Sequence, residues 1–105
     1  MNRAAIPFIL PLIFAAVSPA AAKTIQVTVQ GIAFTPANIS AQVGDTIEWT
    51  NKDFVLHSAT ARDHSWDINL PPNKTGRMVM KKAGAIAYYC RLHPNMTGTI
   101  EVKAK

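Results

Sequence analysis

Three side chains that bind soft metal ions lie close together near the carboxyl end of the chain. Cys90, His93 and Met96 follow one another at Cys-x2-His-x2-Met spacing, and Cys90 is the only cysteine. A thiolate, an imidazole and a weak thioether form a donor set that suits copper. The segment therefore predicts three ligands of one copper site within a short stretch of chain.

A second imidazole is available upstream at His57. Two imidazoles and one thiolate in a plane, with a distant thioether, are the ligand set of a blue-copper electron-transfer centre. Such a set suits both Cu(I) and Cu(II), and electron transfer requires that the two states share nearly one geometry. We therefore take His57 as the candidate for the fourth ligand.

Each of these residues also has an ordinary structural interpretation. A free cysteine is among the most buried residue types, a lone histidine is more often structural, and a methionine can simply pack. A structural zinc site is a weak alternative, because thioether is a poor zinc ligand. The third histidine, His64, stands beside Asp63 in a polar stretch, and we expect it to face solvent rather than to bind a second metal.

The first residues are typical of a secretory signal peptide. A short positive start at Met1–Arg3 precedes an apolar run over 4–17, and Ala20-x-Ala22 fits a cleavage site. The run is too short to span a bilayer, which takes about 20 residues. We expect residues 1–22 to be removed, leaving residues 23–105 as a single periplasmic domain with no membrane anchor.

Composition limits the partners and the means of stabilisation. One cysteine cannot form an internal disulfide. We therefore expect a bound metal to stabilise so small an exported domain. Loss of Arg3 with the signal peptide lowers the formal net charge from +5 to +4. A mildly basic surface favours acidic partners. The basic residues are scattered and the protein is exported, which argues against nucleic acid.

Alternation of apolar and polar residues predicts short strands and no helix. Turn signals at Gly44-Asp45 and Ala83-Gly84 separate them, and Arg62–Thr75 reads mostly as loop. The pattern is typical of an all-β sandwich or barrel. The expected strands lie around residues 25–29, 39–43, 47–49, 57–61, 78–80, 86–90 and 98–102.

This arrangement predicts how the ligands meet. Cys90 ends the penultimate strand and faces inward, and the last strand is expected to start near Thr97. His93 and Met96 would then lie in the loop between two adjacent strands. So short a loop costs little conformational entropy to close. His57 comes from a segment distant in sequence, so metal binding would also stabilise the fold.

At these residues the chain resembles the cupredoxins, and most of all their amicyanin and plastocyanin branch. The resemblance implies a Greek-key β-sandwich of about seven to eight short strands with one type 1 copper ion. It also implies a monomeric single-electron shuttle between redox partners, not an enzyme. The resembling stretches are 34–39, 43–53, 57, 88–96 and 98–100, and the ligand positions they imply are His57, Cys90, His93 and Met96.

Two departures from the branch are notable. Arg62–Thr75 lacks a Gly-rich stretch, and Leu92 stands where short-loop members usually have proline. Unlike proline, Leu92 has a backbone N–H that could reach the Cys90 sulfur, so we predict that Leu92→Pro lowers the reduction potential. Ser58 is expected to bind across to the Cys90 loop through its N–H or hydroxyl.

The surface around His93 is the expected docking site. Leu92 and Pro94 would ring the imidazole, and Arg91 and Lys52 near the rim would orient an acidic redox partner. A second function is open to the same ligands: copper tolerance or copper delivery without electron transfer.

Overall fold

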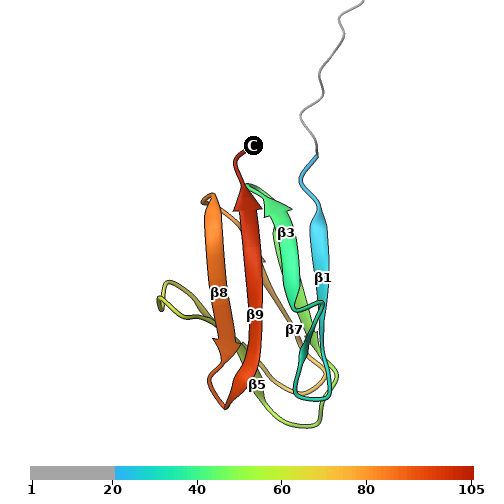
Figure 1. Ribbon diagram of the computed structural model, residues 1–105. Helices are drawn as coiled ribbons and strands as arrows, with labels where there is room; N and C mark the ends of the chain where they lie inside the picture. The colour runs from blue at the N-terminus through green and yellow to red at the C-terminus, as the bar shows by residue number, and fades with distance from the viewer. Residues whose placement is uncertain (1–20) are drawn as a thin grey trace, which may run out of the picture.

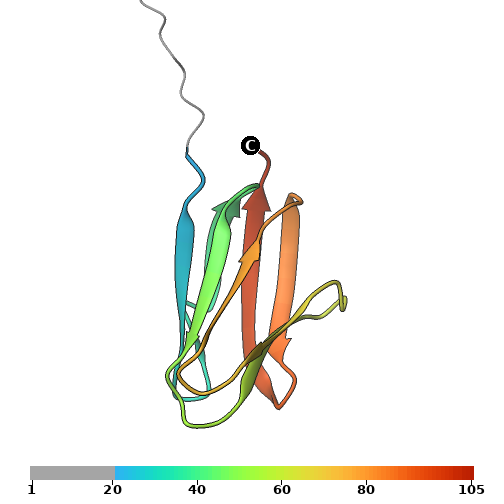
Figure 2. The same cartoon turned by 180° about the vertical axis from the view of Figure 1, so that it is seen from behind.

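A computed structural model describes residues 21–105, whose strands stack as two sheets (Figures 1 and 2). Residues 1–20, and with them most of the expected signal peptide 1–22, lie outside the described part. Within residues 21–105 there are nine strands: β1 (Thr24–Val29), β2 (Phe34–Thr35), β3 (Asn38–Gln42), β4 (Thr46–Asn51), β5 (His57–Ala61), β6 (Asp67–Leu70), β7 (Thr75–Val79), β8 (Gly84–Cys90) and β9 (His93–Lys103).

The strand order of the two sheets confirms the all-β sandwich. One sheet has the order β2-β1-β4-β7 and the other the order β3-β9-β8-β5-β6. The pairs β1–β4 and β3–β9 are parallel and join strands that are not consecutive in the chain. The chain therefore passes repeatedly from one sheet to the other, and β8 and β5 become neighbours with their ends at one pole.

The core between the sheets contains the inward residues of both. Trp49 of β4 and Tyr88 of β8 are fully buried, and the Trp49 indole N–H donates to the Tyr88 hydroxyl at 3.2 Å. A Cβ atom at Gly98 would lie 2.5 Å from the Tyr88 ring, so a side chain there has no room. The predicted core positions Trp49 and Met80 are buried, and Met78 packs partly buried against the same cluster.

The segment Arg62–Thr75 is mostly loop, as predicted, but the prediction missed a strand within it. Strand β6 pairs antiparallel with β5, and Thr75 begins β7. Ile68 and Leu70 alternate with polar residues and turn toward the core, where Leu70 is fully buried. Two inward residues followed by Pro71-Pro72 are too short a pattern to identify a strand from sequence.

The last strand starts earlier than predicted. Strand β9 begins at His93, not near Thr97, and Cys90 pairs with His93 across a turn of only Arg91 and Leu92. The register shifts between Tyr89 and Cys90, which is a bulge-type irregularity. The bulge lets Cys90 and His93 face each other, so His93 and Met96 are strand residues rather than loop residues.

The two poles of the sandwich differ in content. In Figure 1 the β8–β9 turn lies at the lower end, whereas the start of β1 and the end of β9 lie at the upper end. The β5–β6 hairpin projects sideways from the body in both views. Among residues 21–105, no helix has the length and apolar character needed to cross a membrane.

Candidate metal centre

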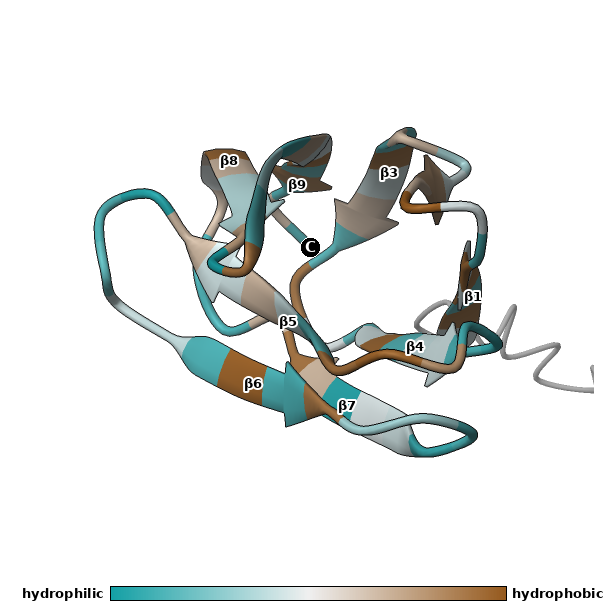
Figure 3. Ribbon diagram, turned by 90° about the horizontal axis from the view of Figure 1, so that it is seen from below, coloured by the Kyte–Doolittle hydropathy of each residue, from teal (hydrophilic) through white to brown (hydrophobic). Residues whose placement is uncertain are grey.

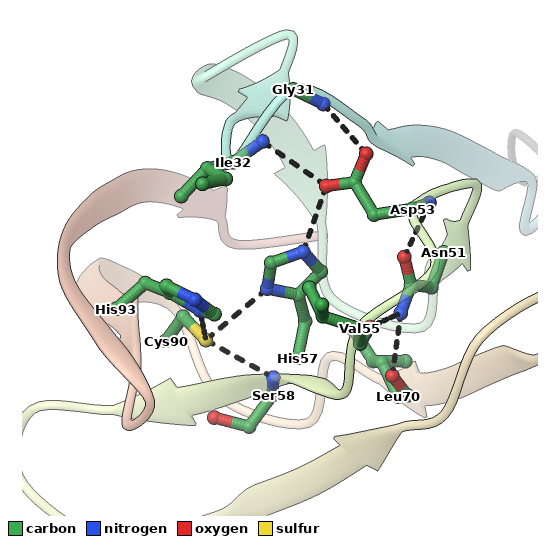
Figure 4. Close-up of polar contacts among 10 residues, drawn as sticks. All are labelled: Gly31, Ile32, Asn51, Asp53, Val55, His57, Ser58, Leu70, Cys90 and His93. Atoms are coloured by element: carbon green, nitrogen blue, oxygen red, sulfur yellow. Dashed lines mark hydrogen bonds and ion pairs between the residues drawn. The ribbon is translucent and has the colours of Figure 1, made fainter.

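Three ligand-type side chains converge at the lower pole. His57 opens β5, Cys90 ends β8 and His93 opens β9, and their ligand atoms all lie within 4.8 Å of one another. The Cys90 Sγ lies 3.6 Å from His57 Nδ1 and 3.7 Å from His93 Nδ1. Figure 4 shows both rings turned toward the sulfur. The pairings of β5 with β8 and of β8 with β9, within one sheet, thus bring residues distant in sequence to one point.

The spacing of these atoms fits a single metal ion. Metal–sulfur and metal–nitrogen bonds of about 2.3 Å and about 2.0 Å, as in a zinc site, separate sulfur and nitrogen by about 3.7 Å at a trigonal angle. The two observed separations are close to that value. A trigonal set of two imidazoles and one thiolate is the geometry of a type 1 copper ion. The donor set therefore fits one such ion.

His57 is held from its far side by Asp53. The Nε2 atom lies 2.8 Å from Asp53 Oδ2, and the imidazole is fully buried. A carboxylate can only accept, so Nε2 carries the proton and Nδ1 presents its lone pair to the sulfur side. A carboxylate behind a ligating histidine fixes the tautomer and the ring orientation. Asp53 therefore prepares His57 for metal binding through Nδ1.

Asp53 is itself fixed by the backbone of the β1–β2 connection. The N–H groups of Gly31 and Ile32 donate to its two oxygens at 2.9 and 3.1 Å. These two N–H groups, Ile32 first, and the His57 imidazole hold the pKa of the Asp53 carboxyl below its usual value of 3.8. The carboxylate is ionised at neutral pH. It joins His57, which opens β5 in one sheet, to the β1–β2 connection of the other sheet (Figure 4).

The connection from β4 to β5 depends on a buried asparagine. Asn51 is fully buried, and its Nδ2 donates to the carbonyls of Val55 at 2.8 Å and Leu70 at 2.7 Å. Its Oδ1 accepts the backbone N–H of Asp53 at 2.8 Å. One amide thus satisfies two backbone groups of the strandless connection and one of β6, which fixes the path into His57.

The Cys90 sulfur accepts several hydrogen bonds. The Ser58 backbone N–H donates to it at 3.3 Å, and the Arg91 N–H donates to the Ser58 hydroxyl at 2.9 Å. Both contacts expected of Ser58 are present. Burial raises the pKa of the Cys90 thiol, but hydrogen bonds from the His93 ring and from the N–H groups of Ser58 and Leu92 outweigh it, and the pKa is lowered from 9.0 to about 6. The site therefore favours the thiolate, which is the form that binds metal.

Met96 and His64 occupy very different places. Met96 is 2% exposed on the inward face of β9 and belongs to the same buried cluster as Cys90. His64 is exposed in the β5–β6 turn with φ of 63°, as was expected of a solvent-facing residue. His93 is half-buried, with its ring centroid 4.9 Å from that of His57.

Sequence reasoning missed the residues that hold the ligands from behind. Asn51 and Asp53 were assigned only to a resembling stretch, although a carboxylate four residues before a candidate ligand is a readable signal. Thr60 and Asp67 gave no such signal, because their contact depends on the register of β5 and β6.

Comparisons with known proteins agree with this geometry. A family model described as a cupredoxin-like domain matches residues 3–102. The methylamine utilization protein MauL of Methylorubrum extorquens is 31% identical over 91 residues, covering 83% of this chain and 80% of that protein.

Solved structures show the same fold. A purple cupredoxin from Nitrosopumilus maritimus superposes with a TM-score of 0.68 at 25% identity, covering 74% of this chain and 98% of that one. A reduced amicyanin variant has a TM-score of 0.67 at 21% identity, covering 76% and 82%, which supports the fold alone. The chain therefore belongs to the cupredoxin-like family, and its His, Cys, His group fits one type 1 copper ion.

Proposed function

We propose that this protein carries single electrons between redox partners by cycling one copper ion between Cu(I) and Cu(II). His57, Cys90 and His93 would hold the ion in a trigonal set, with Met96 as the weak axial ligand. The observation that supports this most directly is the convergence of three ligand atoms within 4.8 Å at one pole. Copper bound there would supply the one-electron chemistry.

The chain's own contribution is to hold the ligands in one arrangement in both oxidation states. Asp53 fixes the ring of His57, and the Ser58 N–H fixes the sulfur of Cys90. Neither hydrogen bond needs the ion, so neither has to rearrange when its charge changes. Donors to the sulfur also tune the reduction potential, because a thiolate that accepts hydrogen bonds donates less to the oxidised metal.

Exposed apolar side chains at this pole supply a docking surface, here called the apolar rim. Ile32, Val55 and Leu92 stand about half exposed beside the ligands, and Figure 3, seen from this pole, shows the hydrophobic colouring of the connection leading into β5. Contiguous exposed apolar surface is typical of interaction sites. The rim consists of Ile32, Phe54, Val55, Leu56 and Leu92.

Charge near the rim favours an acidic partner, but less broadly than the sequence predicted. Arg91 forms an ion pair with Asp67 at 2.9 Å, so its charge is partly compensated. Lys52 is exposed at the start of the connection that carries Phe54 and Val55. The proposed encounter with an acidic redox partner therefore depends on Lys52 and on the net positive charge, and its rate should fall as salt rises.

We place the mature protein, residues 23–105, in the periplasm as a monomeric carrier rather than an enzyme. The sequence pattern of residues 1–22 supports export. The alternative, copper delivery or tolerance, would favour an accessible and labile site. His57 and Cys90 are fully buried and Met96 nearly so, which favours retention of the metal and hence electron transfer.

Voltammetry and metal retention of the copper-loaded protein separate the two functions. An electron carrier should give a reversible one-electron wave, fast self-exchange, and Cu(I) that resists a competing chelator. Sluggish exchange together with ready loss of Cu(I) to the chelator would contradict the proposal and support delivery.

A further inference from the structure

Strand β5 carries two buried hydroxyl groups on one face. Ser58 and Thr60 are two residues apart, and every residue of β5 is buried. Buried hydroxyls must find hydrogen-bond partners, and these two bond each other at 2.9 Å. Each hydroxyl also has a second hydrogen-bond partner, and these two partners lie in different parts of the chain.

The hydrogen bonds run in one direction from the metal-site turn to the edge of the sheet. Thr60 Oγ1 lies 2.7 Å from Asp67 Oδ1, and a carboxylate only accepts, so Thr60 donates to it. Thr60 then accepts the Ser58 hydroxyl, and Ser58 accepts the Arg91 backbone N–H at 2.9 Å. The Thr60 hydroxyl, followed by Arg91, holds the pKa of the Asp67 carboxyl below its usual value of 3.8.

The Arg91 side chain closes this chain into a ring. Its Nε donates to the same Asp67 oxygen at 2.9 Å, and its Nη2 donates to Asn69 Oδ1. Asp67 and Asn69 face the ring because the β5–β6 register pairs them with Thr60 and Ser58. We call this set the Arg91 ring: Arg91, Ser58, Thr60 and Asp67.

Ser58 joins the ring to the sulfur. Its N–H donates to Cys90 Sγ at 3.3 Å while its hydroxyl accepts from the residue that follows Cys90. The turn closed by Cys90 and His93 contains only Arg91 and Leu92, so fixing Arg91 fixes half of that turn. The edge strand β6 is thus connected through two hydroxyls to the Arg91 N–H, next to Cys90, and the backbone N–H of Ser58 completes the link to the sulfur.

We propose that Thr60 and Asp67, with Arg91, are positioning residues for Cys90. The side chains of these residues do not contact the sulfur. They act on it through Ser58 and through the backbone of the turn. In this view the β5–β6 hairpin holds the thiolate in place. The redox consequence rests on the proposed copper function, whereas the ring itself can be tested in the metal-free protein.

Amide hydrogen exchange of the metal-free protein tests the ring first. Thr60→Val removes the connecting hydroxyl, and Asp67→Asn removes the charge at a half-exposed site. Both should speed exchange at the Arg91 and Ser58 amides about tenfold, the effect of losing roughly one hydrogen bond, while the amides of β8 keep their wild-type rates. Glu48→Gln, which breaks the Arg77 ion pair on the other sheet, is the matched control.

The proposal is overturned if the Arg91 and Ser58 amides keep their wild-type rates in Asp67→Asn, or if all amides of β8 speed up together. Unchanged rates would mean that the ring does not hold the turn. A uniform increase would mean that the ring contributes only to the general stability of the sheet. Asp67→Asn still provides the test if Thr60→Val fails to fold.

The reduction potential of the copper-loaded variants tests the consequence. A less well fixed Ser58 N–H donates less to the sulfur, so Asp67→Asn should lower the potential while Glu48→Gln leaves it unchanged. An unchanged or raised potential in Asp67→Asn would overturn the redox part. If the wild-type protein bound no copper, the proposed function would fail, while the exchange result on the ring would still stand.

Discussion

The two segments that bring ligands to the metal pole are built in different ways. The connection that leads to His57 has no strand pairing between Asn51 and His57 and is held by side chains, chiefly Asn51 and Asp53. The turn that holds Cys90 and His93 has only two residues between them and is held by the pairing of β8 with β9. Position is thus set by buried polar groups in one segment and by backbone register in the other.

This difference predicts where each segment is vulnerable. A polar substitution behind His57 should disturb metal binding without unfolding the sheets, because the strands on either side remain paired. The turn should instead respond to changes in its backbone donors, because its side chains other than the ligands are exposed.

The largest effect is expected for Asp53→Asn. The amide cannot serve as an ionised acceptor for His57 Nε2 and for the N–H groups of Gly31 and Ile32 together. Loss of the group that orients a metal-binding histidine typically costs about 10- to 100-fold in metal affinity, and we expect that loss for Cu(II) in a competition titration.

The matched control is Asp63→Asn, which removes a carboxylate that accepts from the N–H and the hydroxyl of Ser65 in the exposed β5–β6 turn. Copper affinity there should equal that of the wild type. Equal affinity in Asp53→Asn as well would mean that the backbone alone positions His57, and the contrast between the two segments would disappear.

The Cys90 thiol should make the metal-free protein more stable as pH rises. Its folded pKa of about 6 is below the ordinary value of 9.0 that applies to the unfolded chain. Between these values the unfolded state binds more protons, so the free energy of unfolding increases with pH through that window. The added stability is lost as pH falls toward 6. Urea unfolding of the wild type and of Cys90→Ser across this pH range measures the contribution. The difference in their free energies of unfolding should widen with pH. Parallel curves for the two proteins would rule out a depressed thiol pKa.

Leu92→Pro tests the backbone donors of the turn. Proline removes the N–H that helps lower the pKa of Cys90, so the thiolate donates more to Cu(II) and the reduction potential falls. Leu92→Ala keeps the N–H and should leave the potential unchanged in the same voltammetry. A potential that stays level or rises in the proline variant would show that this N–H does not tune the sulfur.

The smallest effect is expected for Phe54→Ser. Phe54 is 92% exposed at the tip of the side-chain-held connection, so its removal should change the free energy of unfolding by no more than about 0.5 kcal/mol. The copper spectrum should also stay the same, because Asn51 and Asp53 keep the path to His57. A changed spectrum would show that the apolar tip, not the polar anchors, shapes the connection.

The sequence was informative where chemistry is local and uninformative where register decides. Alternating residues predicted most strands, and Cys90 and His93 were recognisable because their spacing is short. The start of β9 at His93 was missed because it depends on a bulge at Tyr89 and Cys90.

The contacts behind the ligands were missed for a related reason. Strand β6 has only Ile68 and Leu70 as inward residues, and the opposition of Thr60 to Asp67 exists only once β5 and β6 have paired. No local pattern records such a pairing, so the Arg91 ring could not be predicted from sequence.

A titration of the mature domain with Cu(II), followed by visible and EPR spectra, tests the central claim most directly. If His57, Cys90, His93 and Met96 hold one ion, the wild type should saturate at one equivalent with an intense thiolate-to-copper band. That band should vanish on reduction and be absent in Cys90→Ser. An equally intense band in Cys90→Ser, or no such band in the wild type, would contradict the account.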